Sequence, residues 1–101
     1  MVDRRWKRTE RGVLTVLGGR RVPVSGRGDG PDGVSESMPW LSIEIKDRKS
    51  LPKMWGSALE QAERATKPGQ LPIAVWHECG QEYRNSFVML RLGDFVDWFG
   101  G

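Results

Sequence analysis

Residues 41–48 read LSIEIKDR, and this stretch decides the fold expected for the chain. Leucine and two isoleucines occupy the odd positions at its start, and polar or charged residues occupy the even positions between them. Because side chains two positions apart on a strand point to the same face, the pattern predicts a strand over residues 41–47 with one packed and one open face. Glu44 and Lys46 are expected to project together from the open face.

Helices are expected on both sides of this strand. Apolar residues spaced along residues 5–17 predict a first helix, and the glycine pair that follows favours a helix end, because glycine readily takes the left-handed conformation. A second helix is expected near residues 52–66. Ser50 is a suitable cap for this helix, and Pro52 is tolerated in its first turn.

Four further strands are expected, over residues 20–24, 33–36, 71–77 and 87–92. The mostly apolar run over residues 71–77 lacks alternation, which is typical of a central strand covered on both faces. The glycine-rich segment SGRGDGPDG at residues 25–33 is expected to form a loop. A last short helix is expected over residues 95–99, with Asp94 as its cap.

The order of elements is therefore α-β-β-β-α-β-β-α. The strand, helix and strand over residues 41–77 fit a right-handed crossover. A chain of 101 residues has room for one compact domain. We expect residues 1–101 to form a single α/β domain with a mixed central β-sheet flanked by helices.

The composition of the chain narrows its chemistry and its cellular setting. The apolar runs are far too short to cross a bilayer, so no membrane partner is expected. The single cysteine, Cys79, excludes an internal disulfide, and the single histidine, His77, gives no zinc pattern. These features predict a reduced, cytoplasmic protein.

The charges of the chain are distributed unevenly. Residues 1–28 carry eight basic and two acidic side chains, a net charge of +6, whereas residues 29–101 carry eight basic and eleven acidic side chains, a net charge of −3. A basic N-terminal third on a mildly acidic body indicates a polyanionic partner bound at one surface.

Two carboxylates are expected to meet beside the open face of the strand. The glycine-rich loop ends in Pro31-Asp32, and a hairpin-like arrangement would bring Asp32 next to Glu44. Mg²⁺ takes hard oxygen ligands, so this pair fits a Mg²⁺ site in which the carbonyl of Ile45 is a third ligand. Lys46 would orient a water there and offset the charge that develops on phosphorus during attack.

The pattern Pro31-Asp32 followed by Glu44-Ile45-Lys46 resembles the signature of the PD-(D/E)XK nuclease superfamily. Within it, the chain is most similar to small Holliday junction resolvase-like proteins of the archaeal and phage type, over nearly its whole length. The resemblance implies a restriction-endonuclease-like core in the order α-β-β-β-α-β. It also implies cleavage of branched DNA with Mg²⁺, or with Mn²⁺ as the alternative ion, by a homodimer in a bacterial, archaeal or phage-infected cell.

The resemblance assigns roles to individual residues. Asp32, Glu44 and Lys46 match the catalytic motif, Glu10 matches a helical glutamate that joins the metal site, and Gln61 matches a helical glutamine that faces it. Together with the charge pattern, it predicts DNA contacts for eight residues: Arg5, Arg8, Arg11, Arg21, Ser25, Arg27, Arg48 and Lys49.

Several alternatives stay open from the sequence. Asp29 lies in the same loop as Asp32 and could be the metal-binding acid instead. Glu10 could simply pair with its basic neighbours, and Gln61 could be a solvated residue at the border of a helix face. The five tryptophans fit core and dimer packing better than stacking on bases. A nuclease-like module that binds nucleic acid without cutting is the second functional hypothesis, and a structural interaction protein is the third.

Overall fold

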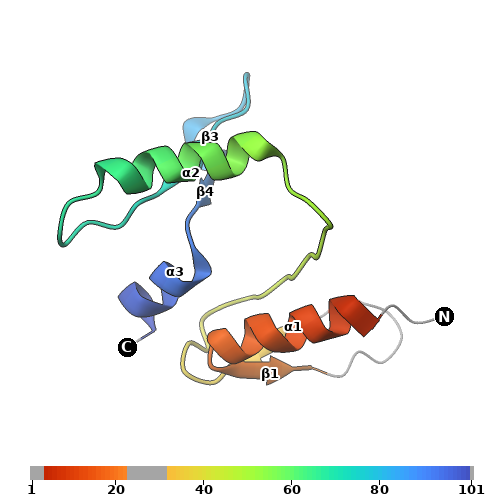
Figure 1. Cartoon of the computed structure of the whole chain (residues 1–101). Helices are drawn as coiled ribbons and strands as arrows, with labels where there is room; N and C mark the ends of the chain where they lie inside the picture. The colour runs from red at the N-terminus through yellow and green to blue at the C-terminus, as the bar shows by residue number, and fades with distance from the viewer. Residues whose placement is uncertain (1–3, 23–31, 101) are drawn as a thin grey trace. The chain divides into compact units, whose positions relative to one another are not determined.

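A computed structural model of the protein describes residues 4–22 and 32–100. Within these residues it contains three α-helices, one 3₁₀ helix and four short strands (Figure 1). Their bounds are α1 Arg4–Val16, β1 Gly19–Arg21, β2 Gly33–Ser35, α2 Lys53–Ala65, β3 Ala74–Trp76, η1 Tyr83–Asn85, β4 Phe87–Met89 and α3 Leu92–Phe99. The predicted α/β class is confirmed. The chain divides into two compact units, residues 1–48 with 99–101 and residues 49–98.

Helix α1 forms as the spacing of its apolar residues predicts. Glu10 and Leu14 are buried on one face of the helix, Leu17 is buried directly after its end, and the helix packs against β1 and β2. The helix ends where the glycine pair predicts, because Gly18 takes the left-handed conformation with φ +69°. Its N–H donates to the carbonyl of Thr15 over 3.0 Å.

Strands β1 and β2 form an antiparallel pair, with Arg20 opposite Val34. The predicted strand at residues 33–36 is confirmed. At Gly33 the sheet approaches α1 so closely that a Cβ atom would overlap Leu14 and lie 2.6 Å from the carbonyl oxygen of Arg20. Glycine therefore lets Leu14, only 1% exposed, fill the centre of this unit.

The strand predicted over residues 41–47 is wrong. Only Ile43 forms a bridge, antiparallel to Gly33. Two residues farther on, the N–H of Ile45 donates to the side chain of Asp32 rather than to a backbone carbonyl, so the ladder stops. The predicted alternation of burial is nevertheless present, because Ile43 is buried whereas Glu44 and Lys46 are exposed.

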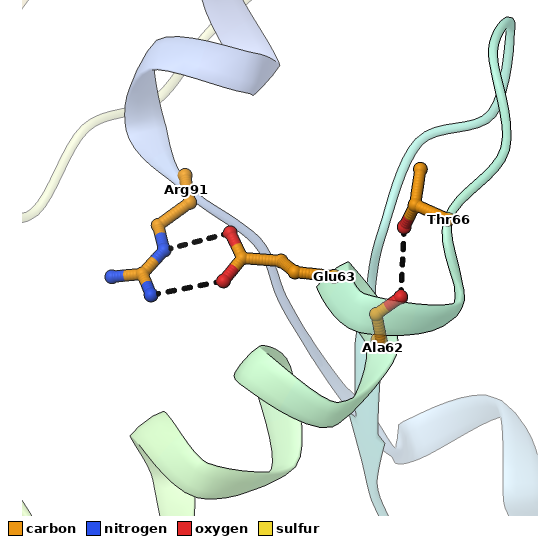
Figure 2. Close-up of polar contacts among 4 residues, drawn as sticks. All are labelled: Ala62, Glu63, Thr66 and Arg91. Atoms are coloured by element: carbon orange, nitrogen blue, oxygen red, sulfur yellow. Dashed lines mark hydrogen bonds and ion pairs between the residues drawn. The ribbon is translucent and has the colours of Figure 1, made fainter.

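The second unit contains α2 and the antiparallel pair of β3 and β4. Leu59 of α2 and Ala74 of β3 are its buried apolar residues among those described. Figure 2 shows that Glu63 of α2 accepts two hydrogen bonds from the guanidinium of Arg91, over 3.1 and 3.2 Å. At the end of the helix, the hydroxyl of Thr66 donates to a carbonyl of the last turn over 2.7 Å.

The boundaries of two helices differ from the prediction. The cap of α2 is Pro52 instead of Ser50, and no side-chain hydrogen bond caps this helix. Helix α3 begins at Leu92, three residues earlier than predicted, and Asp94 lies in its first turn instead of capping it. An acidic residue in a first turn still interacts favourably with the helix dipole.

The strands in the described residues form two separate two-stranded antiparallel sheets. The predicted mixed central sheet is therefore not seen among the described residues. The crossover predicted over residues 41–77 is wrong, because its first strand does not form. β3 pairs only with β4 among the described strands, and its Val75 is 58% exposed, so it is not a central strand. The restriction-endonuclease-like core and the single domain over residues 1–101 stay predictions.

Candidate active site

The first unit contains a hollow of about 410 Å³ whose lining includes most of the predicted motif. Helix α1 supplies one part of the lining and the irregular segment after Ile43 supplies the other. The lining residues are Arg5, Trp6, Glu10, Asp32, Glu44, Ile45, Lys46 and Asp47. The structure thus brings together the predicted Asp32, Glu44 and Lys46 with Glu10 of the helix.

Asp32 is fixed by hydrogen bonds at its backbone and its side chain. Its N–H donates to the carbonyl of Ile43 over 2.9 Å, and its own carbonyl accepts from the N–H of Val22 over 3.2 Å. Its Oδ2 atom accepts a hydrogen bond from the N–H of Ile45 over 2.5 Å. The structure thus engages the amide of Ile45 with Asp32, whereas the sequence suggested its carbonyl as a metal ligand.

The carboxyl group of Glu44 lies against that of Asp32. Hydrogen bonding to Asp32 raises the pKa of Glu44 above its usual value, and repulsion from the Asp32 carboxylate raises it further. Lys46 acts in the opposite direction, and the charge of Glu10 adds a smaller rise in the pKa. The described acids therefore repel one another in the hollow, and a cation would relieve that repulsion.

Glu10 is buried and already paired. Its Oε1 atom accepts a hydrogen bond from Nε of Arg21 over 2.8 Å, and the pair joins α1 to β1. The guanidinium carbon of Arg21 lies 5.8 Å from the ring centre of Trp6. Glu10 therefore enters the site as a fixed, partly neutralised charge, and its predicted part in metal binding stays a prediction.

Asp47 ties the second part of the lining to the helix. Its Oδ2 atom accepts a hydrogen bond from the hydroxyl of Thr9 over 3.0 Å. The same atom forms an ion pair with Nε of Arg5 over 3.2 Å. Lys46, between Asp47 and Glu44, is exposed and forms no ion pair with the described residues. Its ammonium group is thus available to an anion.

The donor set fits Mg²⁺ through two carboxylates. Among the described residues, no three His, Cys, Asp or Glu side chains come together as a metal-binding group. Mg²⁺ usually keeps several waters and is held by one or two carboxylates with substrate phosphate oxygens. The mutually repelling oxygens of Asp32 and Glu44 meet that requirement.

The other predicted site residues lie outside this hollow. Arg8 and Arg11 are exposed on α1, and Arg48 is exposed after the site segment. Lys49 and Gln61 are exposed residues of the second unit, so their roles stay predictions. Three residues fall outside the described part of the chain: Ser25, Arg27 and Asp29.

Trp6 and Asp47 belong to the hollow although the sequence did not single them out. Trp6 precedes Glu10 by four positions, so helical spacing places both on one face of α1. The sequence did contain a signal for this face: Glu10 is an acid between the apolar residues Trp6 and Leu14 at helical spacing. Asp47 continues the odd-numbered positions of Ile43 and Ile45 in LSIEIKDR, and a charge on that inward-facing side indicates a side chain with a partner.

Comparison with known proteins gives no further information. No protein-family model matches the chain, and no curated protein or solved structure matches it significantly. Among the described residues, none of the helices is long and apolar enough to span a membrane.

Proposed function

We propose that the protein is a Mg²⁺-dependent endodeoxyribonuclease of the PD-(D/E)XK type that cleaves branched DNA such as Holliday junctions. The observation that carries the proposal is the meeting of the Asp32 and Glu44 carboxyl groups beside Lys46 in one hollow. The proposal includes Mn²⁺ as an alternative ion, a restriction-endonuclease-like core, a homodimer and a cytoplasmic location.

Asp32 and Glu44 would hold the metal ion in this hollow. Bound Mg²⁺ supplies a polarised phosphoryl oxygen and a more acidic water. Asp32 keeps its orientation through the N–H of Ile45, so its carboxylate is positioned before the substrate arrives. Glu10, held and partly neutralised by Arg21, leaves a smaller negative charge at a fixed position at the edge of the site.

Lys46 would act directly on the phosphate. Among the groups that shift the pKa of Glu44, Lys46 is the one that lowers it, because its positive charge favours the ionised carboxylate. Hydrolysis joins a water oxygen to phosphorus and releases the 3′ oxygen of the neighbouring nucleotide. A cation beside the phosphate stabilises the charge that builds on its oxygens as this bond forms.

The basic side chains of the first unit supply the remaining contacts to DNA. Arg8 and Arg11 are exposed on α1, which carries much of the positive charge of the N-terminal third. Each contact between a basic side chain and a phosphate releases counterions, so binding should weaken steeply as salt increases. Such contacts position the strand without reading its sequence.

A second candidate is a module of the same kind that binds nucleic acid without cutting it. The pairing of Glu10 with Arg21 favours this candidate, because it leaves two acids rather than three for a metal ion. Such a module would keep the salt-dependent binding but would not need Asp32 or Glu44.

A cleavage experiment separates the two candidates. Labelled four-way junction, nicked, flap and linear duplex DNA are incubated with the protein, with and without Mg²⁺. Asp32→Ala and Lys46→Ala are compared with Glu36→Gln, a control because Glu36 is exposed and pairs with Arg20 outside the hollow. Metal-dependent cleavage that both site variants lose, and the control keeps, supports the nuclease; binding without any cleavage supports the binding module.

A further inference from the structure

Trp6 presents an aromatic ring to the same hollow as the two carboxylates. Its residue remains 38% exposed, although it lies on the helix face that buries Glu10 one turn later. The ring has cations around it, with Nζ of Lys7 at 6.0 Å and the guanidinium carbon of Arg21 at 5.8 Å from its centre. Cations over an indole ring are a favourable arrangement, and the exposed part of Trp6 leaves room for a ligand to lie against the ring.

The hollow is lined by three kinds of binding group. It offers a carboxylate pair suited to a divalent cation, an ammonium suited to an anion and an aromatic wall suited to a flat ring. Its volume of about 410 Å³ lies within the range of about 300–1,000 Å³ that is usual for small-ligand sites. A nucleotide unit carries a phosphate and a flat base and so matches all three.

From this juxtaposition we infer that the hollow takes one unpaired nucleotide of a DNA strand, with its base against Trp6 and its phosphate toward Lys46. This inference rests on the proposed function and narrows its substrate class. The DNA that is cleaved has an unpaired or easily frayed nucleotide beside the bond that breaks.

A continuous duplex does not offer such a nucleotide without a cost. Its bases are paired and stacked inside the helix, and moving one out to a side-chain ring costs a few kcal/mol. The cost is least where the base is already unpaired, as at a flap, a strand end or the centre of a junction. Trp6 would therefore select DNA by its structure and not by its sequence, since every base has a face that stacks.

The neighbours of Trp6 support a binding role over simple packing. Arg21 is held by Glu10, so its guanidinium stays near the ring without closing the hollow. Lys7 is a half-buried side chain of the same helix turn, and its ammonium can turn from the ring to a phosphate oxygen.

The test measures binding by fluorescence anisotropy in the absence of divalent metal, so that no strand is cut. The probes are a labelled single-stranded oligonucleotide and the matching duplex, at one salt concentration. Trp6→Leu should weaken single-strand binding by about 5- to 150-fold, the equivalent of one lost base stack. It should change duplex binding by less than about twofold, because duplex binding depends on phosphate contacts.

Two controls keep the result interpretable. Trp6→Phe keeps an aromatic face and should retain most of the single-strand affinity, and it serves if Trp6→Leu unfolds. Trp98→Leu removes another half-exposed tryptophan, in α3, and should change neither affinity.

Two results would overturn the inference: equal loss of affinity for single strand and duplex in Trp6→Leu, or no loss for either. The proposed function fails separately. Cleavage that Asp32→Ala abolishes, with no selective effect of Trp6→Leu, keeps the nuclease and rejects the nucleotide site. A selective loss in Trp6→Leu without any cleavage keeps the nucleotide site and rejects the nuclease.

Discussion

The N–H of Ile45 donates a hydrogen bond to Oδ2 of Asp32 over 2.5 Å, across thirteen positions of the chain. This bond has two consequences for the molecule. It ends the β-bridge pairing that begins at Gly33 and Ile43, because a side-chain oxygen takes the place of a backbone acceptor. It also fixes one oxygen of Asp32, so the rest of the carboxylate is oriented next to Glu44.

The pKa of Glu44 should respond to its two neighbours in opposite directions. Asp32→Asn removes the carboxylate that raises this pKa, so the value should fall toward the ordinary 4.5. Lys46→Ala removes the cation that lowers it, so the value should rise. Carbon-detected NMR titration of the glutamate carboxyl carbons measures both shifts. Equal shifts in one direction, or no shift in Asp32→Asn, would show that the two carboxyl groups do not meet.

Ser35 should contribute strongly to the stability of the first unit. It is 2% exposed, donates to the carbonyl of Leu17 over 2.5 Å and accepts from the N–H of Met38 over 2.9 Å. Ser35→Ala removes the hydroxyl that bonds to the Leu17 carbonyl and the Met38 N–H, so it should lower the free energy of unfolding by about 1–3 kcal/mol.

Denaturant unfolding with Ser42→Ala as the matched variant checks this value. Ser42 is exposed, so its loss should change the free energy of unfolding by less than about 0.5 kcal/mol. Similar effects of the two substitutions would contradict the hydrogen-bonded role of Ser35.

Gly33 and Gly12 should respond to alanine with opposite signs. A methyl group at Gly33 would collide with Leu14 and the carbonyl of Arg20, so Gly33→Ala should lower the free energy of unfolding by about 1–3 kcal/mol. A methyl group at Gly12 meets no atom within 4 Å, and Gly12→Ala should raise that free energy by about 0.5–1 kcal/mol through helix propensity. Thermal and denaturant unfolding measure both, and a neutral Gly33→Ala would contradict the close approach of α1 to β2.

The ion pair in Figure 2 should make stability depend on pH. Hydrogen bonding to Arg91 lowers the pKa of Glu63 below 4.5 in the folded protein. A lowered carboxyl pKa gives stability that is present above the unfolded value of 4.5 and is lost as the pH falls through the folded value. The melting temperature of the protein should therefore exceed that of Glu63→Gln at pH 7, and the difference should disappear in acid.

Glu78→Gln is the matched variant for this measurement. Glu78 is exposed in the same unit and forms no ion pair with the described residues. Its substitution should leave the pH dependence of the melting temperature unchanged. A difference between the protein and Glu63→Gln that persists at low pH would contradict the electrostatic origin of the effect.

Local patterns predicted the helices well because their causes are local. The helix over residues 5–17 and its glycine stop depend on spacing and on one left-handed residue, and Gly18 takes that conformation. The strand over residues 41–47 failed because Asp32, distant in sequence, supplies the acceptor that a neighbouring strand would have supplied. The alternation of apolar residues in a sequence does not indicate a hydrogen bond from a backbone N–H to a distant side chain.

The sequence pointed to Asp32, Glu44 and Lys46 of the hollow, but it did not point to Trp6 or Asp47. Alternation in LSIEIKDR was enough to place Glu44 and Lys46 on one side, and the Pro-Asp motif indicated Asp32. The sequence favoured core and dimer packing over base stacking for the five tryptophans, whereas the structure leaves Trp6 38% exposed at the edge of the hollow. Tertiary placement decides between those roles, and one sequence does not contain it.

The most direct test of the metal site is the broadening of the Ile45 amide resonance by Mn²⁺ in two-dimensional NMR of the intact protein. An ion held by Asp32 and Glu44 lies next to this amide, so substoichiometric Mn²⁺ should broaden its resonance. The double variant Asp32→Asn with Glu44→Gln should abolish the effect, and Glu36→Gln should preserve it. Equal broadening in the protein and in the double variant, or an Ile45 resonance that stays sharp, would contradict the metal site.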